Sequence, residues 1–83
     1  MVDAVYSTSA RKALRRMPRN QADLILGKIE LLLSEPNVLA RNVTNLVNEP
    51  GHRLRVGDWR VLFERKGDTV VVWNIAPRGS AYR

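Results

Sequence analysis

The stretch that decides the fold is His52-Arg-Leu-Arg-Val-Gly-Asp-Trp-Arg-Val-Leu-Phe63. Charged and apolar residues alternate in its first half, which places Leu54 and Val56 on one side of a strand and Arg53 and Arg55 on the other. The glycine and aspartate that follow are a typical two-residue turn between antiparallel strands. The stretch therefore predicts a β-hairpin with one apolar face and one basic face.

The position of the turn also predicts the register of this hairpin. A turn centred on Gly57-Asp58 pairs Val56 with Trp59, Arg55 with Arg60, and Leu54 with Val61. Two arginines directly across an antiparallel pair repel each other, so an anion is the natural occupant of the space between them. The alternative is a solvated edge on which the guanidinium groups splay apart.

Length and composition restrict the kind of site that this chain can build. A chain of 83 residues allows one domain, 1–83, with a net stability of only a few kcal/mol and little room for an internal active site. The absence of cysteine excludes a disulfide scaffold and a thiolate zinc site. A single histidine, His52, leaves few ligands for transition metals, so we expect no metal site and no cofactor.

The first 36 residues predict a strand followed by two helices. Residues 2–6 alternate weakly, and the serines and threonine at 7–9 can cap a helix whose apolar stripe is Ala10, Ala13, Leu14 and Met17. Pro18 ends this helix. Asn20 can cap a second helix, which stops at 34–36 and whose stripe is Ala22, Ile25, Leu26, Ile29, Leu32 and Leu33.

The charge balance is strongly basic. Fourteen Lys and Arg residues against eight Asp and Glu residues give a net charge of +6 and an isoelectric point near 10.8, which favours nucleic acid, an acidic protein segment or an anionic surface as partner. The first helix and the residues after it carry a solvated basic face or a docking face for such a partner, made of Arg11, Lys12, Arg15, Arg16 and Arg19. No apolar run is long enough to span a membrane, and the N-terminus lacks the layout of a signal peptide, so we expect a cytoplasmic protein.

The second half of the chain completes an α+β fold. Residues 37–51 are interpreted as a loop with a short strand or turn around 43–46, and residues 69–75 form an apolar run typical of a central strand. Trp59, Phe63 and Trp73 are assigned to the core. The order β-α-α-β-β-β predicts an N-terminal strand and a helical hairpin packed on a twisted antiparallel β-sheet. The free face would carry Arg53, Arg55 and Arg60, and the C-terminal tail could bring Arg78, Tyr82 and Arg83 to it.

The pattern Arg-x-Arg-Val-Gly-Asp-aromatic-Arg at 53–60 is followed by a second Gly-Asp turn, by Val70-Val-Val, and by Arg78 with Tyr82-Arg83. In this order the residues resemble the RelE/ParE superfamily of toxins from bacterial and archaeal toxin-antitoxin modules, and the resemblance covers nearly the whole chain. It implies a small RelE-like fold and a cognate antitoxin, with the possibility of higher-order toxin-antitoxin assembly. In the RelE branch it also implies cleavage of messenger RNA in the ribosomal A site.

The resemblance carries specific roles to residues of this chain. It implies that Arg53 and Arg55 hold the phosphate region of the RNA, with Arg83 beside them, and that Arg60 stabilises the reacting phosphate. Arg78 resembles an arginine that acts in transition-state stabilisation or as general acid, and Tyr82 resembles a general base. One departure is the Pro77-Arg78 pair, since many relatives have His-Arg there. Proline removes a titratable group and fixes φ locally.

The expected chemistry is metal-independent attack by an RNA 2′-hydroxyl on the neighbouring phosphate. It needs a base for the hydroxyl, positive charge around the phosphorane and an acid for the departing 5′ oxygen. The arginines meet the second requirement, and they would favour the phenolate form of Tyr82. His52 is an alternative base, although it shares strand parity with Leu54 and is expected to point away from the arginines.

Two further functions are compatible with the same sequence. The first is that of a ParE-like toxin, which binds and inhibits DNA gyrase without being an enzyme. The second is that of a degenerate relative that only binds nucleic acid. Retention of the three hairpin arginines together with Arg78 and Tyr82 favours the ribosome-dependent mRNA endonuclease.

Overall fold

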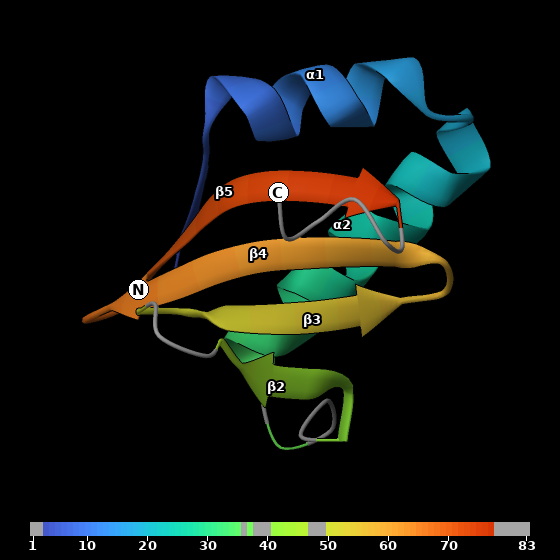
Figure 1. Ribbon diagram of the computed structural model, residues 1–83. Helices are drawn as coiled ribbons and strands as arrows, with labels where there is room; N and C mark the ends of the chain where they lie inside the picture. Colours follow the sequence, from blue (N-terminus) through green and yellow to red (C-terminus); the bar gives the residue numbers. More distant parts are fainter. Residues whose placement is uncertain (1–2, 36, 38–40, 47–49, 78–83) are drawn as a thin grey trace.

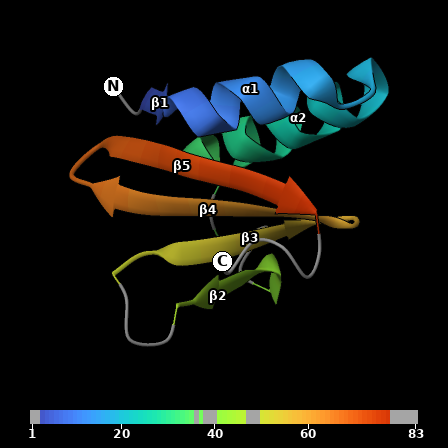
Figure 2. The same cartoon turned by 45° about the horizontal axis from the view of Figure 1, so that its top comes forward.

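The computed structural model describes residues 3–35, 37, 41–46 and 50–77. The elements follow the order β1 (Asp3–Tyr6), α1 (Thr8–Arg16), α2 (Arg19–Ser34), β2 (Val43–Asn45), β3 (His52–Val56), β4 (Trp59–Lys66) and β5 (Thr69–Pro77). The strands form one twisted sheet in the order β1-β5-β4-β3-β2, and both helices lie on the same face of it (Figures 1 and 2). This is the predicted α+β architecture of two helices on a sheet.

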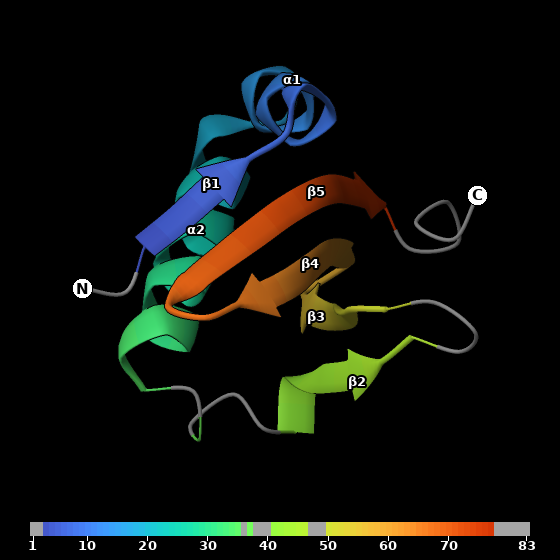
Figure 3. The same ribbon diagram turned by 90° about the vertical axis from the view of Figure 1, so that its left-hand side faces the viewer.

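The sheet differs from the prediction at the edge formed by β1 (Figure 3). β1 pairs with β5 in parallel, so the sheet is mixed rather than wholly antiparallel. The helical hairpin between β1 and the rest of the sheet is a crossover long enough to permit a parallel pair. At the other edge, the short segment expected as a strand or turn is β2, which pairs with β3 antiparallel.

The register of the β3–β4 hairpin is the predicted one. Val56 is paired with Trp59, Arg55 with Arg60, and Leu54 with Val61. The turn between the strands is at Gly57-Asp58, and Gly57 has φ 58°, in the left-handed region that glycine adopts without steric cost. Local turn chemistry and strand alternation therefore determine this part of the fold.

Both helices form, with corrections to the second one. Ser7 caps α1 as expected, since its Oγ accepts a 3.0 Å hydrogen bond from the Ala10 backbone N–H. The prediction that Asn20 caps α2 is wrong, because the cap residue is Pro18 and Asn20 lies inside the helix. Proline suits this end because it has no N–H to leave unsatisfied and its fixed φ fits the entry to a helix. Leu26, assigned to the core, is exposed.

The core lies between the helices and one face of the sheet. The helices contribute Ala10, Met17, Ala22, Ile25, Ile29 and Leu32, and the strands contribute Leu54, Val56, Val61, Phe63, Val70, Val72 and Ile75. The strand contribution from β5 breaks the alternation of a regular strand, because Val72 and Ile75 are three residues apart. A β-bulge at Trp73, between the pairs Phe63↔Val72 and Leu62↔Asn74, absorbs the extra residue.

Gly51 is a position where the close approach of backbone groups excludes a side chain. Its φ is +115°, and a Cβ added there would lie 2.9 Å from the Phe63 carbonyl oxygen. We expect Gly51→Ala to lower the free energy of unfolding by about 1–3 kcal/mol. Gly27→Ala is the matched control, because Gly27 lies in α2 with nothing within 4 Å of an added Cβ, and it should raise stability by up to about 1 kcal/mol. Urea unfolding of both variants measures the difference, and equal midpoints would contradict it.

Candidate functional site

The hairpin arginines lie on the face of the sheet opposite the helices. Leu54 and Val56 are buried in the core, so the alternating residues Arg53 and Arg55 of β3 point to the other face. Arg60 of β4 is paired with Arg55, and Arg53 is paired with Leu62. We call this surface the open face. It brings the three arginines together on two adjacent strands, as the alternation predicts.

The Arg60 guanidinium is bound to the hairpin's own backbone. Its Nη1 donates to the Trp59 carbonyl oxygen at 3.1 Å and to the Gly57 carbonyl oxygen at 3.3 Å. These bonds draw the Arg60 charge toward the turn and reduce its repulsion with Arg55, which is exposed to solvent. The geometry positions one cation near the turn and leaves the other accessible to an anion.

The remaining predicted site residues lie outside the described part of the chain. These are Arg78, Tyr82 and Arg83, whose assigned roles stay predictions. The last described residue is Pro77, which is paired with Trp59 at the start of β4, next to Arg60. The chain therefore leaves β5 at the arginine end of the open face.

The structure gives His52 a packing role on the helix-covered side. Its ring lies 5.3 Å from the Phe63 ring, measured between centroids, and its Nδ1 is 2.7 Å from Asn45 Oδ1. His52 is two residues before the buried Leu54 on β3, so its side chain is on the same face as that of Leu54 and points away from the arginines, as predicted. A direct role for His52 as base is not supported by this orientation.

Tyr6 is the tyrosine within the described residues, and it also lies on the helix-covered side. It packs against the core, and burial, with Glu30 nearby, raises its pKa. A tyrosine with a raised pKa stays neutral at physiological pH and is a poor general base. The stability that this neutral group contributes is present below its ordinary pKa and is lost as the pH rises through the raised value.

The three large aromatic residues assigned to the core have different environments. Phe63 is buried in the core as predicted. Trp59 is partly buried against the core, and its Nε1–H donates to Gln21 Oε1 on α2 at 2.8 Å. The assignment of Trp73 to the core is wrong: it directly follows the core residue Val72, so its side chain lies on the open face, where it lines a hollow.

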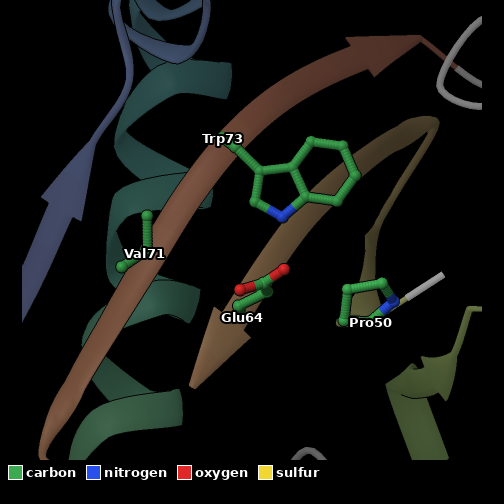
Figure 4. Close-up of a pocket in the computed structure, with 4 residues that line it drawn as sticks. All are labelled: Pro50, Glu64, Val71 and Trp73. Atoms are coloured by element: carbon green, nitrogen blue, oxygen red, sulfur yellow. The ribbon is translucent and has the colours of Figure 1, made fainter. Parts of the chain in front are cut away.

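This hollow is the feature that sequence reasoning missed. It has a volume of about 390 Å³ and is lined by Pro50, Glu64, Val71 and Trp73, as Figure 4 shows. The Trp73 Nε1–H is buried and has no hydrogen-bond partner in the structure. The signal that could have found it is the alternation along β5, which places Val71 and Trp73 on the face opposite Val70 and Val72.

The basic residues of α1 are exposed, as are Pro18 and Arg19 after the helix. Within the described residues, no group of three or more His, Cys, Asp or Glu side chains could hold a metal ion. In the same part of the chain, no helix is long and apolar enough to cross a membrane. The candidate site is the open face, which carries Arg53, Arg55 and Arg60 on two adjacent strands.

Comparison with known proteins shows which family model the chain matches. A family model described as "ParE toxin of type II toxin-antitoxin system, parDE" matches residues 4–82. No curated protein sequence matches the chain.

Solved structures share the fold at low sequence identity. The intact RelBE toxin-antitoxin complex of E. coli contains a chain with TM-score 0.76 and 14% identity, over 96% of this chain and 99% of that one. The RelB-RelE complex of Methanococcus jannaschii gives TM-score 0.75 and 22% identity, over 94% of each chain. A chain of the archaeal RelE-RelB complex of Pyrococcus horikoshii OT3 gives TM-score 0.73 and 21% identity, over 95% of this chain and 97% of that one. These matches confirm the RelE-like fold.

Proposed function

The chain belongs to the ParE toxin family of type II toxin-antitoxin systems, and we propose that, as a toxin, it inhibits translation by ribosome-dependent cleavage of messenger RNA. The observation that carries the proposal is the placement of Arg53, Arg55 and Arg60 on one face of two adjacent strands. Fixed positive charge around a phosphate stabilises the extra negative charge of a phosphorane. A surface of this kind suits RNA cleavage without a metal ion.

The proposed reaction uses the RNA's own 2′-hydroxyl as nucleophile. A base, assigned to Tyr82, takes the hydroxyl proton, and the 2′ oxygen attacks the adjacent phosphorus. The bond from phosphorus to the 5′ oxygen then breaks, and that oxygen takes a proton from the acid, assigned to Arg78. The products are a 2′,3′-cyclic phosphate and a free 5′-hydroxyl. Arg60 stabilises the phosphorane, while Arg53, Arg55 and Arg83 bind the flanking phosphates.

Placement of the RNA is expected to come from the ribosome. Among the described residues, the open face is a sheet surface without a deep cleft around the arginines. Tyrosine and arginine are also a weak general base and a weak general acid at neutral pH, because both side chains titrate well above neutrality. By holding the messenger RNA in the A site, the ribosome would align the 2′-hydroxyl with the phosphorus, and such alignment can remove a large part of the activation barrier to cleavage.

The alternative is a toxin that binds and inhibits DNA gyrase without cleaving RNA. It is favoured by the ParE family model, which matches 4–82. In that case the arginines would form a protein-binding surface, and Tyr82 would have no proton to transfer.

One pair of assays separates these functions. Primer extension on messenger RNA in a translating extract should show new 5′ ends within codons when the chain is added, and none when ribosomes are absent. Supercoiling by purified gyrase should be unaffected at the same concentration. Inhibited supercoiling with intact messenger RNA would establish the gyrase alternative instead.

A cognate antitoxin is the expected protein partner, since the similar structures are of toxin-antitoxin complexes. The open face and the net charge of +6 favour an antitoxin that carries carboxylates toward the arginines. We expect fast association that slows as salt rises, with apolar contacts that keep the complex intact. The test is co-expression with the neighbouring reading frame in the cytoplasm, followed by purification in high salt. The two proteins should be recovered together, as a simple complex or as a higher-order assembly. Recovery of this chain alone, harmless to its host, would contradict the proposal.

A further inference from the structure

The described residues that line the hollow beside Trp73 include one hydrogen-bond donor and one acceptor, with apolar residues around them. The donor is the Trp73 Nε1–H, which is buried and has no partner in the structure. The acceptor is the carboxylate of Glu64, whose side chain is 28% exposed and lies 3.8 Å from Lys66 Nζ. Figure 4 shows the indole nitrogen directed toward the same space as the Glu64 carboxylate, with Pro50 and Val71 on either side. A buried donor without a partner costs free energy that a ligand can recover.

We propose that this hollow binds a guanine base of the RNA substrate, an inference that rests on the proposed RNA cleavage. Guanine has two parallel N–H donors on one edge, which match the two oxygens of a carboxylate, and acceptors on the neighbouring edge for an indole N–H. Its flat faces can contact the Pro50 ring and the Val71 side chain while its edges meet the two polar groups. Proteins bind unstacked bases of single-stranded RNA through contacts to their faces and hydrogen bonds along their edges.

The position of the hollow relative to the arginines supports a nucleotide. Glu64 is on the open face of β4, two residues beyond Leu62, which is paired with Arg53. It is four residues from Arg60, a separation of about 13 Å between Cα atoms at the usual strand rise. A short RNA segment can therefore place one base in the hollow and its phosphates along the arginines.

An antitoxin segment fits the hollow less well than a base does. An apolar side chain would fill the space, and a peptide carbonyl could accept from Trp73, but neither gives the Glu64 carboxylate a donor besides Lys66 to replace the water that it loses. An antitoxin rich in carboxylates, as the net charge of +6 favours, would also meet repulsion at Glu64. A base supplies neutral N–H groups at this point.

The two tryptophans of the chain provide a direct readout with an internal control. Within the described part of the chain the indole N–H of Trp73 has no hydrogen-bond partner, whereas that of Trp59 donates to Gln21 Oε1 at 2.8 Å. In ¹⁵N-labelled full-length chain, titration with guanosine 5′-monophosphate should shift the Trp73 indole resonance and leave that of Trp59 in place. The 5′-monophosphates of adenosine, cytidine and uridine should shift it less at equal concentration. Trp73→Phe assigns the resonance by removing it.

Substitution of Glu64 tests the recognition itself. Glu64→Gln keeps the size of the side chain but replaces one acceptor oxygen with a donor, so affinity for guanosine monophosphate should fall roughly 10- to 100-fold. Glu30→Gln, an exposed carboxylate on α2, should leave the affinity unchanged. In primer extension, Glu64→Gln should move cleavage away from codons that contain guanine.

Each outcome decides the proposal independently of the proposed catalysis. An unmoved Trp73 resonance at millimolar nucleotide, or equal shifts with all four nucleotides, overturns guanine recognition even if the chain cleaves messenger RNA. A shift caused by the purified antitoxin but by no nucleotide assigns the hollow to the protein partner and overturns it too. A selective response to guanosine monophosphate in a chain that fails to cleave RNA supports the base site while refuting the nuclease.

Discussion

Replacement of Arg60 by alanine is expected to reduce RNA cleavage by about 10²- to 10³-fold while the protein stays folded. The magnitude is that of removing one fixed charge or donor from a developing anion. Folding should be nearly unaffected, because Arg60 lies directly across from Arg55 and its removal relieves that repulsion. The two carbonyl oxygens that it binds, of Gly57 and Trp59, are near the turn and can bind water instead. Primer extension measures the loss, and a thermal melt measures stability.

The control for this variant is Lys12→Ala, which removes the same charge from an exposed residue of α1, on the side of the sheet opposite the arginines. It should retain cleavage to within a few-fold, because a distant exposed charge is screened by salt. Loss of several kcal/mol of stability in Arg60→Ala would show that Arg60 is structural. Equal losses of cleavage in both variants would show that only net charge matters, and would place the site elsewhere.

The hairpin and the arginine face could be predicted because they depend on local rules. The turn at Gly57-Asp58 and the alternation before it determine the register, and a strand places every second side chain on the same face. Once Leu54 is known to face the core, the orientation of Arg53 and Arg55 follows. The family resemblance then assigned roles to this face, and the match over 4–82 confirms the membership but does not test those roles.

The edges of the sheet could not be predicted, since they depend on contacts between segments distant in sequence. The alternation at 2–6 indicates a strand but does not say which strand it joins or in which direction. The helical hairpin carries the chain from β1 to the opposite edge at β2, and the antiparallel succession from β2 to β5 then brings β5 beside β1, parallel to it. The exposure of Leu26 has a similar origin: the apolar stripe of α2 is wider than the sheet surface that covers it.

The hollow beside Trp73 was missed because the apolar run at 69–75 predicts a central strand, with Trp73 in the core. Counting alternate residues from Val72 places Trp73 on the open face and Ile75 there as well, yet Ile75 is buried in the core. The apolar run at 69–75 obscures the irregularity, because every residue in it except Thr69 and Asn74 is apolar. Only the pairing of β5 with β4 shows that Trp73 is the inserted residue.

Replacement of Tyr82 by phenylalanine is expected to abolish most of the RNA cleavage, by about 10²- to 10⁴-fold, the usual contribution of a general base. Phenylalanine keeps the aromatic ring and removes only the ionisable hydroxyl, so the fold and antitoxin binding should be retained. The result bears on the Pro77-Arg78 departure, because a chain without the histidine of many relatives depends more heavily on its remaining proton acceptor. Cleavage in a translating extract and growth arrest on expression measure the effect, with Tyr6→Phe as the control that removes a hydroxyl from the helix-covered side. Full toxicity in Tyr82→Phe, together with inhibited supercoiling by gyrase, would refute the nuclease mechanism, because a gyrase-binding surface needs no proton acceptor at this residue.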